Sequence, residues 1–230
     1  MNAHDLPERL PVFPLPEIVL FPGVPLPLHI FEPRYRAMMG DVLSRPADQR
    51  LIVMALLRPG WEADYDGTPP TYPIATVGEI LHSKSLDDGR YLITLRGLER
   101  IRLTGEEAVT DGGYRVARVA RAPESADGLS GSGVVDALVR LLDDFAAWTG
   151  GVPISVRRED LEARQEARGL VLNTLAFHLS SAAGTRQELL EEDDLARRLE
   201  RLARIVADGL GGKRALDAWR PKRPDDPGVN

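Results

Sequence analysis

The first half of the chain alternates short apolar runs with turn-forming residues. Residues 10–15 and 26–30 are apolar runs interrupted by prolines, which favour edge or irregular strands. The uninterrupted run 51–57, LIVMALL, has the length of a buried strand. This pattern predicts a set of short strands with frequent turns.

A hairpin is the most specific local signal in this half. Two strand-like runs, 74–86 and 90–103, flank Asp87-Asp88-Gly89, and an Asp-Gly pair tolerates the positive φ angles that a tight hairpin turn needs. A last strand is predicted over 114–120. One helix is predicted within this region over 33–43, because Pro33 suits the first helical position and apolar residues recur there at helical spacing.

The second half has helical periodicity. Apolar stripes predict helices over 134–148, ended by Gly150-Gly151, and over 157–182. Thr185 and Glu188 have the spacing of a capping box and predict a short helix to residue 191. Asp193 or Asp194 then caps a helix over 195–208, for which Gly209 is the expected C-terminal cap.

Proline usage divides the chain. Fourteen of the 18 prolines lie at or before Pro123, and the stretch SADGLSGSG at 125–133 has the composition of a flexible connection. We therefore expect an α+β protein in which residues 1–124 form a largely antiparallel β-barrel or sandwich and residues 125–220 form a helical bundle. Residues 221–230 have few apolar side chains and are expected to form a flexible tail.

Composition and charge exclude several classes of function. The chain has no cysteine, so it has neither disulfides nor thiolate metal sites nor a cysteine nucleophile. Its 29 basic and 35 acidic residues give a net charge of -6, which provides no general attraction to nucleic acid or to an anionic membrane. The longest apolar run is far shorter than the ~20 residues that span a bilayer, and the amino terminus lacks the pattern of a signal peptide. We expect a cytoplasmic protein.

Motifs for nucleotide hydrolysis or nucleophilic catalysis are incomplete. Gly209 to Lys213 lacks the spacing and the Ser/Thr of a nucleotide-binding P-loop, and Gly128 to Ser132 lacks the last glycine of a nucleophile elbow. Ser83 and Ser85 flank Lys84, but neighbouring strand residues point to opposite faces. His29 and Glu32 have a metal-ligand spacing but precede the predicted helix, so no metal and no other cofactor is expected.

Aromatic residues gather in one loop. Trp61, Tyr65 and Tyr72 lie in or beside the Gly- and Pro-rich segment 58–70, where they form either a hydrophobic patch that binds polypeptide or a cover over the end of the barrel. Both interpretations remain open on the sequence alone.

A series of motifs carries a family resemblance. LPVFPL at 10–15, VLFPG at 19–23, LPLHIFE at 26–32 and RYR at 34–36 resemble the opening of the Lon protease amino-terminal domain. VGEI at 77–80, DGR at 88–90, GLER at 97–100 and ELL at 188–190 resemble later parts of the same domain, in the same order. The resemblance extends over about residues 10–208 and is close to that of the small stand-alone bacterial relatives of this domain.

The resemblance implies a PUA-like antiparallel pseudo-barrel followed by a helical bundle, and a role in selecting protein substrates. Without the ATPase and peptidase motifs, a non-enzymatic module is expected, with unfolded or hydrophobic polypeptide segments and a separate ATPase or protease as partners. The expected anchors for polypeptide are Trp61, Tyr65, Tyr72 and, on the 33–43 helix, Tyr35.

RNA binding is the alternative, because PUA-like barrels also occur in RNA-binding proteins. It would require five arginines to share one barrel face, namely Arg96, Arg100, Arg102, Arg115 and Arg118. A net charge of −3 over residues 1–124, from 14 basic and 17 acidic residues, makes nucleic acid the less favoured partner.

Overall fold

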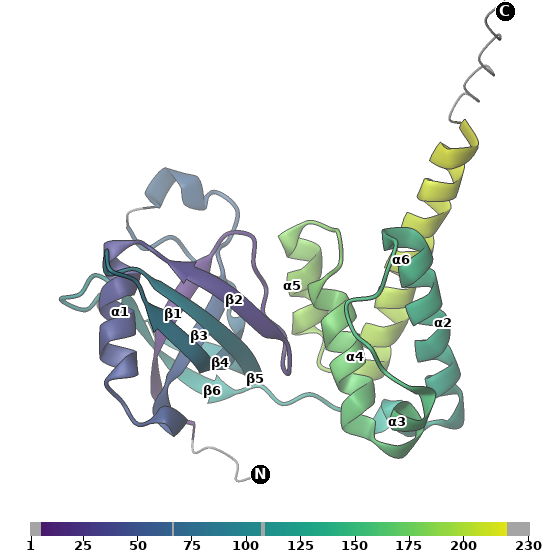
Figure 1. Cartoon of the computed structure of the whole chain (residues 1–230), viewed down its shortest axis with the longest axis horizontal. Coiled ribbons are helices and arrows are strands. Elements are labelled where there is room, and N and C mark those ends of the chain that lie inside the picture. The colour runs from purple at the N-terminus through teal and green to yellow at the C-terminus, as the bar shows by residue number, and fades with distance from the viewer. Residues whose placement is uncertain (1–5, 66, 107–108, 220–230) are drawn as a thin grey trace, which may run out of the picture.

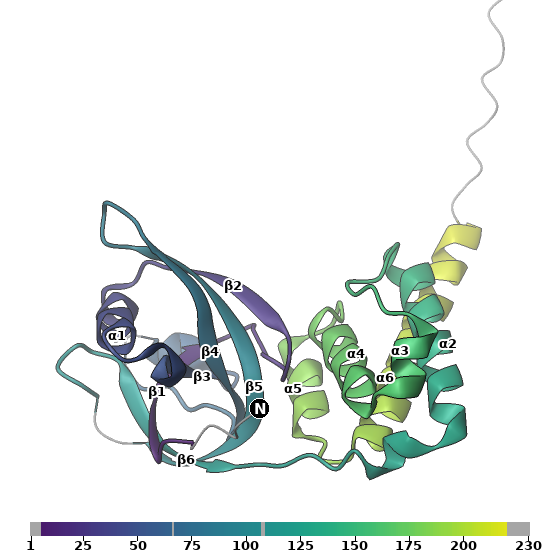
Figure 2. The ribbon, with the colours of Figure 1, turned by 60° about the horizontal axis from the view of Figure 1, so that its bottom comes forward.

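The computed structural model describes residues 6–65, 67–106 and 109–219. Strands occupy the amino-terminal part and helices the carboxy-terminal part, which lie beside each other with α5 (Ala183–Glu191) nearest the strands in both views (Figures 1 and 2). The predicted tail, 221–230, lies outside the described residues.

Six strands form one sheet that closes on itself. They are β1 (Arg9–Leu15), β2 (Pro25–Ile30), β3 (Leu51–Leu56), β4 (Ile74–Ser85), β5 (Tyr91–Glu106) and β6 (Arg115–Arg121). Their order is β2-β5-β4-β3-β1-β6, and an additional β5–β6 pairing completes a ring. All pairings are antiparallel except that of β1 with β3. The predicted α+β pseudo-barrel is confirmed.

The predicted hairpin is formed by β4 and β5. Gly89 occupies its turn at a φ of 78°, the left-handed conformation that glycine adopts without strain. The register shifts between Val77 and Gly78 and between Ile80 and His82, and such bulges bend a strand. β5 can therefore pair with β2, β4 and β6 along its 16 residues.

The sequence predicts an edge or irregular strand over residues 10–15; β1 is not an edge, because it pairs with another strand on both sides. It pairs with β6 along Arg9–Val12 and with β3 along Val12–Leu15. Pro11 thus lies where only β6 is paired and Pro14 where only β3 is paired, so each missing N–H can face an unpaired side. Among the described residues, β2 pairs with β5 alone and is an edge, one of the two forms predicted for this run.

Helix α1 (Pro33–Leu43) begins and ends where the sequence predicts. Its buried residues, Tyr35, Met38, Met39 and Val42, belong to the main hydrophobic core. Short 3-10 helices follow at Ala47–Gln49 (η1) and Trp61–Asp64 (η2).

The helical part differs from prediction in its boundaries. Its α-helices are α2 (Ser132–Thr149), α3 (Arg158–Ala163), α4 (Gln165–Phe177), α5 and α6 (Leu195–Trp219). The single helix expected over 157–182 is divided because Arg164 is extended, at φ -136° and ψ 121°. The prediction of a capping box at Thr185 is wrong, because α5 begins at Ala183 and its N-cap residue makes no side-chain hydrogen bond. Asp194 does cap α6, accepting a hydrogen bond of 2.8 Å from the Ala196 N–H.

Gly209 is not the end of a helix. α6 continues past it to Trp219, and a β-carbon at Gly209 would lie 2.4 Å from Cε2 of Trp148 on α2. The glycine therefore allows close helix packing instead of stopping the helix.

The segment 125–133 is also not a flexible connection. It contains a third 3-10 helix, η3 (Asp127–Ser130), and Leu129 is fully buried in the core. Ser125 forms backbone hydrogen bonds with Asp193 and Leu195. The division into units 1–124 and 125–220 stays a prediction, although strands give way to helices at that place.

The main hydrophobic core extends through both parts. It joins barrel residues such as Phe21 and Leu95 to helical residues such as Leu172 and Leu202. A smaller core lies within the barrel, around Val53 and Ile101. Burial on this scale fixes the helices against the strands.

Buried arginines connect the two parts. Arg198 on α6 is fully buried, pairs with Glu124 after β6, and donates to Oδ1 of Asn173 at 2.7 Å. Arg100 on β5 also faces Glu124, with Nη1 3.6 Å from Oε1, and pairs with Asp193. A single carboxylate thus lies between two buried guanidinium groups.

Candidate functional site

The aromatic loop is closed at its base by backbone pairing. The Arg58 N–H donates to the Pro70 carbonyl at 2.8 Å, and the Tyr72 N–H donates to the Leu56 carbonyl at 2.9 Å. Gly60, at a φ of 90°, turns the chain into η2, which carries Trp61. The loop therefore holds its aromatic side chains on a fixed base.

Trp61 and Tyr72 line a groove of about 240 Å³ between the barrel and α5. We call it the junction groove. Its lining consists of Pro16, Leu56, Leu57, Pro59, Trp61, Glu62, Tyr72, Ala183 and Gly184. Prolines, leucines and aromatic rings dominate, and small residues of α5 leave space opposite them. Such a lining suits bulky apolar side chains.

A more polar pocket of about 480 Å³ lies beyond Tyr72, which lines both spaces. Its other lining residues are Arg58, Pro73, Ile74, Arg102 and Glu191. The Arg58 guanidinium carbon lies 5.4 Å from the centre of the Tyr72 ring, a cation–π contact, while its Nε donates to the Thr71 carbonyl at 3.1 Å. The apolar groove thus adjoins side chains that can pair with a backbone or a charged group.

Tyr65 connects the loop to the start of α1. Its hydroxyl donates to Oε1 of Glu32 at 2.7 Å, and the Arg34 guanidinium carbon lies 5.0 Å from its ring centre. The hydrogen bond to Glu32 raises the pKa of Tyr65. Its ring contacts that of Trp61 edge-on at 5.5 Å, and the side chain is 38% exposed. Tyr65 therefore supports Trp61 and is itself partly open to solvent.

Tyr35 belongs to the core. It is 5% exposed, its ring centre lies 4.3 Å from that of Phe13, and burial raises its pKa to about 12. Of the expected anchors, it is the one that the structure does not bring to the surface of the loop.

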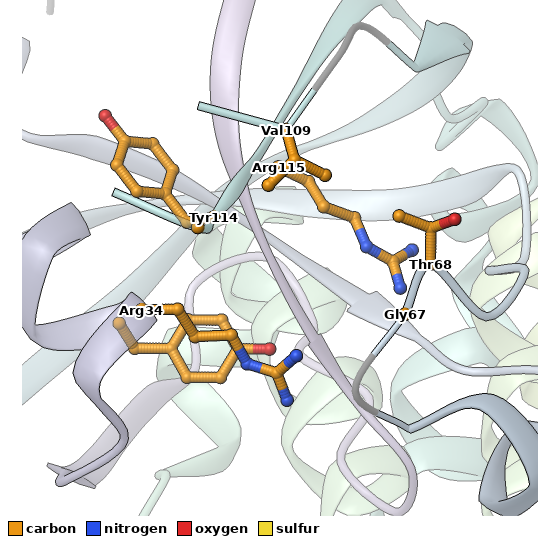
Figure 3. A pocket seen from close by; sticks show the side chains of 8 residues that line it. Arg34, Gly67, Thr68, Val109, Tyr114 and Arg115 are labelled. Atoms are coloured by element: carbon orange, nitrogen blue, oxygen red, sulfur yellow. The ribbon is translucent and has the colours of Figure 1, made fainter. Parts of the chain in front are cut away.

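A separate small cavity of about 110 Å³ lies on the other side of the loop, lined by Arg34, Tyr35, Gly67, Thr68, Val109, Gly113, Tyr114 and Arg115. Figure 3 shows Arg34 and Arg115 reaching toward the loop at Gly67 and Thr68 from different elements. Arg115 donates to the Pro69 carbonyl at 2.7 Å, and Arg34 pairs with Glu32 at 2.8 Å. These arginines hold the loop in place.

The arginine face that RNA binding would require is not formed. Arg100 and Arg115 are buried at 2% and 6% exposure, and Arg96 pairs with Glu79. Arg100 and Arg115 therefore point into the fold, whereas the Arg96 side chain is 48% exposed and its charge is compensated by Glu79.

Sequence reasoning missed the helical side of the junction groove. Pro16, Ala183 and Gly184 are far from Trp61 in sequence, and small residues at a helix start carry no signal for a binding site. Among the described residues, no group of three or more His, Cys, Asp or Glu side chains could hold a metal ion, and no helix is long and apolar enough to cross a membrane.

Comparison with known proteins identifies the family. The family model of the ATP-dependent protease La (LON) substrate-binding domain matches residues 9–208. The chain belongs to this family. The resemblance inferred from the motifs is confirmed over nearly the same residues.

Full-length Lon proteases are among its relatives. Lon protease 2 of Syntrophobacter fumaroxidans is 28% identical over 203 residues, which cover 87% of this chain and 24% of that protein. Lon protease of Xanthomonas oryzae is 26% identical over 211 residues, 89% of this chain and 24% of that protein. The chain thus spans about a quarter of the length of these relatives.

Solved structures of Lon amino-terminal domains share the fold. The Lon N-terminal domain protein from Xanthomonas campestris has a TM-score of 0.56 at 27% identity, covering 93% of this chain and 99% of that one. The N-terminal domain of Mycobacterium avium complex Lon protease has a TM-score of 0.62 at 16% identity, covering 87% and 98%. Both matches include the strands and the helices, so the two-part architecture is that of a Lon N-terminal domain.

Proposed function

We propose that this protein recognises unfolded or hydrophobic polypeptide segments and binds them in the junction groove. The observation that carries the proposal is the convergence of Trp61, Tyr72 and Pro59 with the small residues of α5 around one apolar space, in a chain of the Lon substrate-binding family. Aromatic side chains in a partly closed apolar space are the usual anchors of polypeptide contacts.

The role is non-catalytic. The family is that of a substrate-binding domain, and the sequence of this chain contains neither a complete P-loop nor a complete nucleophile elbow. A separate ATPase or protease would act on the captured segment, and the cytoplasm is the expected compartment. RNA binding is the weaker alternative, since buried Arg100 and Arg115 are unavailable to phosphates.

The test is binding of a permanently unfolded polypeptide, such as fluorescein-labelled lactalbumin that has been reduced and alkylated, followed by anisotropy. Trp61→Ala should weaken binding about tenfold or more, because a truncated aromatic anchor typically costs about 2 kcal/mol. Leu216→Ala is the matched control, since Leu216 is 68% exposed on α6 and lies outside the groove lining.

The two interpretations of the loop give opposite results. If Trp61 binds polypeptide, Trp61→Ala changes the melting temperature little and reduces binding. If Trp61 only covers the end of the barrel, melting falls by several degrees and binding stays intact, which contradicts the proposal.

A further inference from the structure

A concave surface of the barrel, larger than the junction groove, lies away from it. It has a volume of about 530 Å³ and is lined by residues of β2, β4 and β5: Pro27, Leu28, His29, His82, Ser83, Lys84, Leu92, Ile93 and Thr94. These three strands lie side by side in Figures 1 and 2. We call this surface the strand face; it shares no lining residue with the junction groove.

Strand register shows which side chains share the outer side. His29 on β2 pairs with Leu92 on β5, which pairs with Lys84 on β4. Two residues further along each strand, and so on the same side of the sheet, Pro27 pairs with Thr94, which pairs with His82. Neighbouring strands lie about 4.8 Å apart, so Leu92 and Thr94 of β5 lie one strand spacing from His29 on β2 and from Lys84 and His82 on β4.

Three large apolar side chains on the strand face or on the strand segments beside it are exposed. Leu92 is 45% exposed in the middle of a strand, and Phe31, just after β2, is 59% exposed with its ring 5.8 Å from that of His29. Leu81 occupies the bulge between Ile80 and His82 and is 40% exposed. Large apolar side chains exposed on one side of a folded protein are a feature of interaction sites.

The charge of the strand face is the opposite of that of the whole protein. The described lining contains His29, His82 and Lys84 but no Asp or Glu, whereas the chain carries a net charge of -6. Two acidic residues that flank the face are neutralised, because Glu79 pairs with Arg96 and Asp88 pairs with Arg90. Within the described part of the chain, Lys84 has no ion-pair partner.

We propose that the strand face binds extended polypeptide segments in which a bulky apolar side chain is flanked by aspartate or glutamate. The apolar side chain would lie over Leu92 and Thr94, with carboxylates reaching Lys84 and His82 on one side and His29 on the other. The inference rests on the proposed function only in taking polypeptide as the ligand, and it assigns a second surface with its own selectivity.

The geometry argues against two other occupants. A second copy docked through the same face would meet Lys84 with a lining that contains a lysine but no Asp or Glu, so it would offer no complementary charge. Addition of a strand to the free edge of β2 is hindered because Pro25 and Pro27 have no N–H to donate. A segment lying across the face avoids both problems.

The test uses three labelled twelve-residue peptides and anisotropy with the full chain. The first contains leucine and phenylalanine flanked by glutamate, the second has lysine in place of glutamate, and the third has serine in place of the apolar residues. We expect the first to bind at least tenfold more tightly than the other two. Equal binding of the glutamate and lysine peptides overturns the inference.

Variants locate the site. Lys84→Glu should weaken binding of the glutamate peptide tenfold or more and strengthen binding of the lysine peptide, and Leu92→Thr should weaken both. Arg204→Glu, an equal change of charge at an exposed position of α6, is the matched control and should leave all affinities within twofold. If Lys84→Glu and Arg204→Glu behave alike, the strand face is not the site.

The remaining outcomes separate this inference from the proposed function. Loss of glutamate-peptide binding in Trp61→Ala but not in Lys84→Glu assigns the peptide to the junction groove and overturns the inference alone. Failure of unfolded lactalbumin to depend on Trp61, with the Lys84 effect intact, overturns only the junction groove. A concentration-dependent dimer abolished by Lys84→Glu, or single-stranded RNA binding lost in that variant, replaces the polypeptide with a second copy or a nucleic acid.

Discussion

Replacing Glu124 by glutamine should lower the free energy of unfolding, because this residue compensates the buried charges between the barrel and the helices. Glu124 is the carboxylate between Arg100 and Arg198, and the Arg198 side chain is 0% exposed. Burial lowers the pKa of Arg198, and the attraction of Glu124 opposes that shift. Glu124→Gln keeps the size and the acceptor oxygen but removes the charge that compensates Arg198.

The expected loss in the free energy of unfolding follows from the contacts that Arg198 keeps in Glu124→Gln. Removing one partner of a buried ion pair typically costs 3–5 kcal/mol. Arg198 would still donate to Asn173 and to the Glu192 carbonyl at 2.8 Å, and the Glu124 side chain is 17% exposed, so the lower end of this range applies. A loss of about 3 kcal/mol corresponds to about 6–12 °C in melting temperature for a chain of this length.

Thermal and urea unfolding, followed by circular dichroism, measure this loss. Glu99→Gln is the matched control, because Glu99 also pairs with an arginine, Arg121 at 2.7 Å, but the two side chains are 31% and 47% exposed. An exposed pair contributes about 0–1 kcal/mol. Equal effects of the two substitutions would refute the argument that burial makes the Glu124 charge essential.

Further predictions concern close packing and tyrosine ionisation. Gly209→Ala should destabilise the protein by about 1–3 kcal/mol, because the added β-carbon would meet the Trp148 ring. Gly212→Ala in the same helix, where the β-carbon would have nothing within 4 Å, should be neutral or stabilising by up to about 1 kcal/mol. Urea unfolding of both variants measures the two changes in stability. Burial is the main cause that raises the pKa values of Tyr35 and Tyr114 to about 12 in the folded protein. Unfolded tyrosine titrates near pH 10, so between about pH 10 and 12 the unfolded state binds fewer protons than the folded state, and the free energy of unfolding falls as pH rises. Absorbance at about 295 nm, where tyrosinate absorbs, should then show a late-titrating component that decreases in Tyr35→Phe; an unchanged titration curve would contradict the assigned burial.

Local sequence patterns determined most of the elements. The Asp-Gly pair determined the β4–β5 hairpin because few residues tolerate its turn, and Pro33 with the following apolar spacing determined α1. The buried run at 51–57 became β3, which has all six of its residues buried. The ordered motifs also sufficed to recognise the family, since each motif combines turn residues with core residues.

Tertiary packing decided what local signals left ambiguous. Gly209 looks like a helix end in sequence, but the approach of Trp148 from α2 explains the glycine instead. Segment 125–133 has the composition of a flexible connection, yet Leu129 is fully buried and orders it. Composition describes only local freedom, whereas burial of one side chain depends on elements distant in the chain.

The candidate site shows the same division. The sequence by itself determined that aromatic residues gather in the loop after β3, and that the chain lacks catalytic motifs. Only the tertiary structure showed that the expected anchors have different environments. Tyr35 packs in the core against Phe13, and the Tyr65 hydroxyl donates to Glu32. Trp61 and Tyr72 lie opposite α5 across a groove. A groove requires two surfaces, and the second surface here comes from residues more than a hundred positions away, which no local pattern can specify.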